Sequence, residues 1–154
     1  MSKTKKRTLL LCAGLAILVS LAVIAFFVWG LQLRTGYKAM CLEINDAVLA
    51  TAADEARVSR GGEEWPADGE LVDYLNQSLL REKQPFSRKE APENDKSIIL
   101  TLHGGRLSFT ELPDGAIAIR WETPEGVQSY SVRSDTGFRH CSAYLSNYLR
   151  RFES

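Results

Sequence analysis

An uninterrupted apolar run from Leu9 to Leu31 constrains this chain more than any other feature of its sequence. The run reads LLLCAGLAILVSLAVIAFFVWGL and has no charged residue in 23 positions. As an α-helix with a rise of about 1.5 Å per residue it is roughly 34 Å long, enough to cross a hydrocarbon core of about 30 Å. We therefore predict a transmembrane anchor at residues 9–33, with the lipid bilayer as the partner of Leu9 to Leu31.

The basic residues on either side of the run predict its orientation. Four of them precede it and two follow it closely, namely Lys3, Lys5, Lys6 and Arg7 before the run and Arg34 and Lys38 after it. Lys and Arg are enriched on the cytoplasmic side of membrane helices. We therefore expect residues 1–8 to form a cytoplasmic basic tail and residues 34–154 to lie outside, in a single-pass protein of the cell membrane.

A cleaved signal peptide is the competing interpretation, because it also begins with basic residues followed by an apolar run. Signal peptides usually have apolar regions of about 7 to 15 residues, shorter than the run in this chain. In addition, no small-residue cleavage pattern follows between Leu31 and Met40. The length of the run and its flanks therefore favour an uncleaved anchor.

The part of the chain after the anchor is about 120 residues long, which suffices for one domain with its own core but not for two. Four of the 19 Lys and Arg lie in the tail, so the external part has 15 against 19 Asp and Glu. Binding of nucleic acid needs a concentrated basic surface. The mildly acidic charge of the domain therefore argues against nucleic acid as a partner.

Helical spacing of apolar residues predicts three helices in the external part, at residues 35–59, 70–83 and 137–152. The apolar stripe of the first consists of Tyr37, Cys41, Ile44, Val48 and Ala52. Asp68 is the candidate N-cap of the second helix. Residues 84–97 (QPFSRKEAPENDKS) are polar and contain two prolines, so they are expected to form a solvated connector.

Four short segments with alternating apolar and polar residues indicate a β-meander over residues 97–133. The segments are Ser97–His103, Arg106–Leu112, Ala116–Glu122 and Val127–Arg133. Turn sequences such as Gly104-Gly105 separate them, so neighbouring strands are expected to pair antiparallel. The residues predicted to share the buried face are Ile98, Leu100, Leu102, Leu107, Phe109, Ile117, Ile119, Trp121, Tyr130 and Val132. The opposite face, with Ser108, Thr110 and Ser131, is expected to meet water.

Together these elements predict an α+β fold: an N-terminal transmembrane helix, then amphipathic helices and a four-stranded antiparallel β-meander with a C-terminal helix. Helices are expected to cover one face of the sheet. The N-cap candidates of the C-terminal helix are Ser134, Asp135 and Thr136.

Cys41 and Cys141 are the only cysteines outside the anchor, one near each end of the external domain. A bridge between them would close a loop of about 100 residues, worth up to about 4.7 kcal/mol in the chain-entropy model. We therefore predict a Cys41–Cys141 disulfide if the domain faces an oxidising compartment. The alternative is a pair of buried free thiols, since unpaired cysteine is among the most buried residue types.

Side chains suited to catalysis or metal binding are sparse. The two histidines, His103 and His140, come without a nucleophile motif such as G-x-S-x-G. His140 does not face Cys141, because neighbouring residues on a helix point in different directions. The cysteines and histidines also lack the paired spacing of zinc ligands. We therefore expect no enzymatic activity, no cofactor and no metal site.

The order of the elements resembles that of type IV pilins and their pseudopilin relatives. The shared features are a basic N-terminus, an apolar helix that runs into an amphipathic one, a connector, an antiparallel meander and a cysteine near the C-terminus. The family's processing motif, a glycine followed by an aromatic residue or Met and then a glutamate, has no counterpart in Arg7–Ala13. The resemblance implies a component of a pilus or secretion assembly.

The sequence as a whole predicts a membrane-anchored extracytoplasmic protein with an interaction or structural role and a protein partner that it does not identify. The pseudopilin-like component is one alternative. The other is a small-ligand-binding or enzymatic module that uses Arg106, Arg120 and Arg133 on the open face of the sheet.

Overall fold

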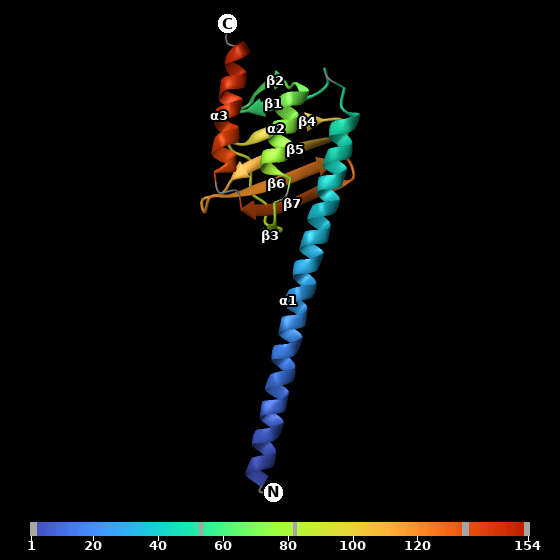
Figure 1. The fold of residues 1–154 in the computed structure, drawn as a ribbon, viewed down its shortest axis with the longest axis vertical. Helices are drawn as coiled ribbons and strands as arrows, with labels where there is room; N and C mark the ends of the chain where they lie inside the picture. The colour runs from blue at the N-terminus through green and yellow to red at the C-terminus, as the bar shows by residue number, and fades with distance from the viewer. Residues whose placement is uncertain (1–2, 53, 82, 134–135, 153–154) are drawn as a thin grey trace.

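The computed structural model describes residues 3–52, 54–81, 83–133 and 136–152, and side chains from Leu10 onward. Its helices are α1 (Lys3–Ala50), α2 (Gly69–Leu79), α3 (Gly137–Leu149) and the 3₁₀ helix η1 (Arg150–Phe152). Its strands are β1 (Arg57–Arg60), β2 (Glu63–Pro66), β3 (Pro85–Ser87), β4 (Ile98–Leu102), β5 (Gly105–Glu111), β6 (Ala116–Thr123) and β7 (Gly126–Arg133). The predicted mixed α+β class is confirmed, with α1 projecting from an α+β body (Figure 1).

The strands of the described chain form one antiparallel sheet in the order β2-β1-β4-β5-β6-β7-β3. Its centre is the predicted meander, β4 to β7, in which each strand pairs with the next along the chain. The sheet has seven strands rather than four, because β1 and β2 extend one edge and β3 extends the other. These added strands are three or four residues long, too short for an alternating pattern to stand out in the sequence.

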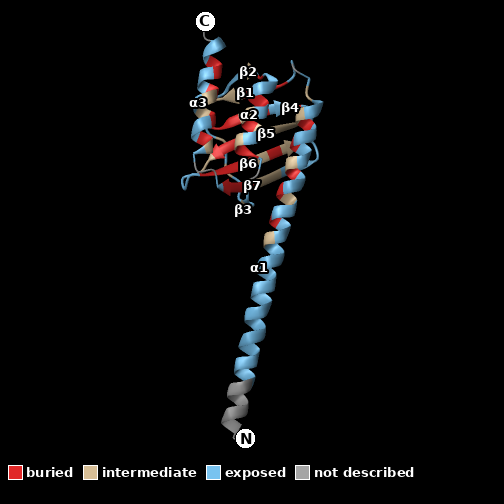
Figure 2. Cartoon of the chain, viewed as in Figure 1, coloured by how far each residue is buried: buried red, intermediate tan, exposed pale blue. Residues whose placement is uncertain are grey.

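Two different environments surround α1. From Leu10 to Gln32 its residues are exposed, apart from the half-buried Gly30 (Figure 2). Farther along, one stripe is buried, formed by Leu33, Tyr37, Met40, Ile44 and Ala47. Their spacing of three and four residues places them on one face of the helix. Leu33, predicted to belong to the anchor, is therefore part of the core of the domain.

The predicted helix over residues 35–59 is wrong at its C-terminal end. The helix stops at Ala50, and Arg57–Arg60 is strand β1, paired with both β2 and β4. Pairing with β4 buries Val58 completely. Intrinsic helix propensity is a weak preference that tertiary packing overrides, so the alanine-rich sequence did not decide the structure here.

Three helices, α1, α2 and α3, cover the same face of the described sheet, with α2 between the other two (Figure 1). Contacts on both sides of α2 agree with this order. The Tyr37 hydroxyl of α1 donates a hydrogen bond of 2.8 Å to the carbonyl oxygen of Leu80, and the Tyr74 ring of α2 stacks on Tyr144 of α3 at 4.2 Å. All ten residues predicted to share the inner face of the meander are buried beneath these helices.

The connector between β3 and β4 covers the other face of the sheet and is not simply solvated. The Ser131 hydroxyl of β7 donates to the Lys89 carbonyl oxygen at 3.3 Å, and Arg106 of β5 forms an ion pair with Glu93 at 2.7 Å. The Ser97 and Thr110 hydroxyl oxygens lie 2.8 Å apart. Ser131 and Thr110, predicted to meet water, are consequently buried, as is Ser108.

The ends of α2 and α3 partly match the sequence predictions. Asp68 is the N-cap of α2, accepting a hydrogen bond of 2.8 Å from the Leu71 amide, as predicted. The helix predicted over 70–83 ends at Leu79, and the helix predicted over 137–152 is divided into α3 and η1. Thr136 precedes α3 without a side-chain cap bond, while the cap candidates Ser134 and Asp135 lie outside the described residues.

We predict that Ile44→Ala lowers the free energy of unfolding by about 2 to 5 kcal/mol, because it leaves a cavity where α1 enters the core. Leu42→Ala is the matched control on the same helix, since Leu42 is 66% exposed, and its effect should stay within about 0.5 kcal/mol. Denaturant unfolding of the detergent-solubilised chain measures both. Equal destabilisation by the two variants would show that α1 is not seated on the sheet by this stripe.

Candidate functional site

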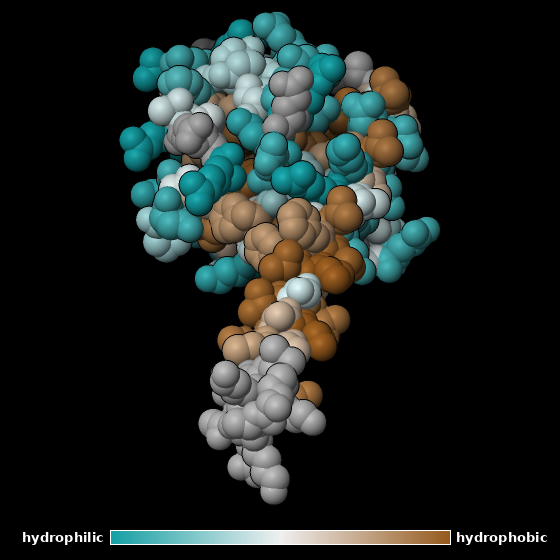
Figure 3. Space-filling model, turned by 60° about the horizontal axis from the view of Figure 1, so that its bottom comes forward, coloured by the Kyte–Doolittle hydropathy of each residue, from teal (hydrophilic) through white to brown (hydrophobic). Residues whose placement is uncertain are grey.

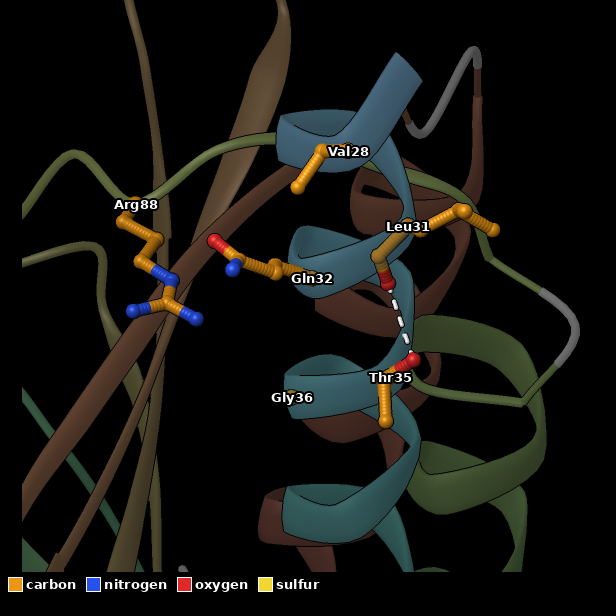
Figure 4. A pocket seen from close by; sticks show the side chains of 6 residues that line it. All are labelled: Val28, Leu31, Gln32, Thr35, Gly36 and Arg88. Carbon is orange, nitrogen blue, oxygen red and sulfur yellow. Dashed lines mark hydrogen bonds between the residues drawn. The ribbon is translucent and has the colours of Figure 1, made fainter. Parts of the chain in front are cut away.

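A pocket of about 400 Å³ lies where the exposed part of α1 meets the domain. It is lined by Val28, Leu31, Gln32, Thr35, Gly36 and Arg88. The first five come from consecutive turns of α1, and Arg88 immediately follows β3 (Figure 4). The pocket therefore joins the apolar end of the predicted membrane span to the edge of the sheet.

Packing against Tyr130 of β7 positions Arg88. The centre of the Arg88 guanidinium lies 5.6 Å from the centroid of the Tyr130 ring, a cation–π distance. Tyr130 is itself buried and meets Tyr37 of α1 edge to face at 5.5 Å. This arrangement holds the arginine close to α1.

Gly36 allows the close approach of these groups to α1. A Cβ at this position would clash with the Tyr130 hydroxyl oxygen and would lie 3.1 Å from Arg88 Nη2. Any other residue at position 36 would therefore push Tyr130 and Arg88 away from the helix. Arg88 is the one charged side chain among the described residues that line the pocket, so its field there is positive.

A second recess, of about 560 Å³, lies between α1 and α2. Its lining includes Tyr37, Cys41, Asn45, Asn76 and Lys83. Burial raises the pKa of the Cys41 thiol, while its interaction with the Tyr37 hydroxyl acts in the opposite direction. Burial also raises the pKa of Tyr37, so this hydroxyl stays protonated and continues to donate to the Leu80 carbonyl. The recess is a cleft of mixed polar and apolar lining without an activated nucleophile among its described residues.

The predicted Cys41–Cys141 disulfide is not formed in the structure. Both are free cysteines that are not close to one another, and Cys141 interacts instead with Ser78 of α2. The physical reason is the position of α2 between α1 and α3, since packed helix axes lie about 8 to 10 Å apart and a disulfide requires Cα atoms within about 7 Å. The alternative of free thiols matches the structure, with Cys141 buried and Cys41 half-buried.

The other candidate residues do not converge on one site. His103 is exposed with its Nδ1 3.8 Å from the Glu55 carboxylate, and His140 is exposed on α3. Among the described residues, no group of three or more His, Cys, Asp or Glu is arranged to hold a metal ion. The three arginines proposed for the open face of the sheet do not share a ligand in the structure. Arg106 forms an ion pair with Glu93, Arg120 forms one with Glu122 at 3.1 Å, and Arg133 is exposed.

Sequence reasoning missed the pocket at Arg88, because Arg88 falls within the polar connector. A weak signal was present in the sequence, where Phe86 precedes the basic pair Arg88 and Lys89, a combination found in segments that lie on a membrane surface. No family model, curated protein or solved structure matches this chain. Function is therefore inferred from the geometry of the chain itself.

We predict that Cys41 is alkylated by iodoacetamide more slowly than free cysteine at pH 8, because its raised pKa leaves a smaller thiolate fraction. The rate should keep rising beyond the pH at which an ordinary thiol is half ionised, about 8.5. Tyr37→Phe should slow the reaction further, because it removes the interaction that lowers the pKa of Cys41. Peptide mass mapping of the labelled protein follows each rate.

Tyr37→Phe should also lower the free energy of unfolding by about 1 to 3 kcal/mol, because the buried carbonyl oxygen of Leu80 loses the hydrogen bond from the Tyr37 hydroxyl. Tyr144→Phe is the control, since its hydroxyl makes only an exposed 3.4 Å bond to Glu70. A Cys41–Cys141 disulfide in non-reduced peptide maps, or unchanged alkylation in Tyr37→Phe, would contradict this description of the cleft.

Proposed function

We propose that this protein is a single-pass membrane protein that holds its α+β domain at a fixed height and orientation beside the bilayer for contacts with other proteins. One helix among the described residues is long and apolar enough to cross a membrane, and it is the same helix whose last turns enter the core of the domain. That continuity is the observation that carries the proposal.

The stiffness of α1 supports a fixed position of the domain relative to the span. α1 extends over 48 residues from Lys3 to Ala50, and its sequence contains no proline. Helices without proline or a bulge curve only gently. The domain end of α1 is held by Leu33, Tyr37, Met40, Ile44 and Ala47, so a flexible linker does not separate the span from the domain. A domain mounted in this way keeps one face toward the membrane.

The outward face of α1 supports a role in protein contacts. Leu42 and Leu49 are 66% and 78% exposed, seven residues apart and therefore on the same side of the helix. Both lie beyond the predicted span, where water would otherwise surround them. A partner helix that leaves the same membrane would cover both leucines while following the axis of α1.

The cell membrane location and the orientation complete the proposal. The excess of basic residues before the span favours a cytoplasmic N-terminus, which puts the domain outside the cell. The free thiols of Cys41 and Cys141 are compatible with a domain outside the cell, because α2 keeps the two cysteines apart whatever the redox conditions.

A pseudopilin-like component is the second candidate, favoured by one feature of the structure. The N-terminal part of α1 projects freely while its C-terminal part packs on an antiparallel sheet, which leaves the projecting part available for assembly with further helices (Figure 1). The intact mass of the membrane-extracted chain distinguishes the two candidate functions. A processed N-terminus would favour the pseudopilin-like component, and an unprocessed N-terminus would favour the single-pass anchored protein.

We predict that alkaline carbonate leaves the chain in the membrane pellet, because an apolar span of this length is not released with peripheral proteins. Protease added to intact cells should remove a C-terminal epitope. Replacing the four basic tail residues with glutamine should increase the fraction of chains whose C-terminal epitope is protected from protease, since the charge bias that sets the orientation is lost.

A cytoplasmic marker protein that stays intact serves as the control for cell integrity. Release of the chain by carbonate would overturn the anchor, and an epitope that survives protease in intact cells would overturn the orientation.

A further inference from the structure

We propose that the pocket around Arg88 binds the phosphate of an anionic membrane phospholipid headgroup. This inference rests on the proposed function, because it requires α1 to span the bilayer. The residues that carry it are Arg88 and Gln32 as donors and Val28 and Leu31 as the apolar part of the site.

The position of the pocket along α1 matches the headgroup layer. Leu31 is the last residue of the apolar run, and the lining extends from Val28 to Gly36, about 12 Å along the helix axis. The headgroup layer on one side of a bilayer is about 5 to 8 Å thick. With the run centred in the hydrocarbon, Val28 and Leu31 lie at its edge and Gln32 lies among the headgroups. Figure 3 shows hydrophobic surface on α1 continuing to the base of the domain.

The chemistry of the lining suits a phosphodiester. A guanidinium donates two parallel hydrogen bonds to phosphate oxygens, and the side-chain amide of Gln32 offers a further N–H donor. Figure 4 shows the ends of Arg88 and Gln32 directed into the same space beside α1. The Thr35 hydroxyl is already used, since it donates to the Leu31 carbonyl at 2.9 Å. No carboxylate lines the described pocket to compete for the guanidinium.

The site is also built in advance of binding. Tyr130 stacks against Arg88, and Gly36 lets both approach α1, so the arginine is held beside the pocket by groups that are part of the folded core. Phe86 of β3, two residues before Arg88, exposes an apolar ring that contact with lipid would cover. A free phosphate ion would use the arginine but would leave Val28 and Leu31 without a partner, which favours a lipid.

The test uses the full chain reconstituted in phosphatidylcholine vesicles with and without phosphatidylglycerol, then extracted into a mild detergent and washed. Lipid retained per protein is counted by mass spectrometry. The wild-type chain should retain phosphatidylglycerol, and Arg88→Ala should retain about fivefold less, the effect of one arginine at an anionic membrane surface. Arg151→Ala is the matched control, because the Arg151 guanidinium also lies over a tyrosine ring, 5.1 Å from the centroid of Tyr148. Arg151 belongs to η1 at the C-terminal end of the chain, which lies away from the N-terminal part of α1 (Figure 1).

A second measurement is the thermal midpoint of the wild-type chain in detergent, which should rise with added phosphatidylglycerol and not with the same concentration of inorganic phosphate. Equal lipid retention by Arg88→Ala and the wild type, or equal stabilisation by inorganic phosphate, would overturn this proposal. Carbonate extraction of the same vesicles separates the two proposals: a chain that stays in the pellet but retains no lipid refutes only the lipid site, whereas a released chain refutes the anchor.

Discussion

The structure depends on one helix, α1, whose apolar N-terminal segment is exposed and whose C-terminal turns are packed into the core of the domain. From Leu9 to Leu31 α1 carries apolar side chains on every side, the pattern of a helix that lipid can surround, and from Leu33 to Ala47 it buries one apolar stripe against the domain. The change occurs within about one turn, between Leu31 and Leu33. Because the helix is continuous through this change, it fixes the position of the sheet relative to the apolar segment of α1.

The rest of the domain is arranged to hold that helix. Three helices cover one face of the sheet, and the connector that follows β3 crosses the other face (Figure 1). A row of small residues on neighbouring strands, Thr110, Ala118 and Ser131, leaves room for the connector to approach. The same connector begins with Arg88, so the segment that closes the back of the sheet also forms one wall of the pocket beside the apolar end of α1.

Sequence patterns predicted the parts of this fold in which side chains alternate or recur over a sufficient length. The inner face of the meander was predicted residue by residue, because β4 to β7 are long enough to show a period of two. The stripe of α1 was predicted only in part. Tyr37 and Ile44 lie on the buried face, Cys41 and Val48 are only partly buried beside it, and Ala52 is exposed beyond the end of the helix.

Other features of the fold depend on contacts that produce no recognisable pattern in the sequence. The connector is held partly through the backbone carbonyl of Lys89, which carries no sequence signal. The site at Arg88 needs Gly36 and Tyr130, residues far apart in the chain, to meet across α1 and β7. The disulfide prediction failed for a similar reason, since it treated α1 and α3 as neighbours.

The most direct test of the account is the distance between the span and the domain in a bilayer. Spin labels at Ser20 in α1 and Lys96 in the connector, with Cys12 and Cys41 replaced by serine, report it by double electron–electron resonance in lipid nanodiscs. Both labelled positions are exposed, and the buried Cys141 stays unlabelled. A continuous helix seated in the core predicts one narrow distance distribution. A broad or multiple distribution would show that the domain moves independently of its anchor and would contradict the account.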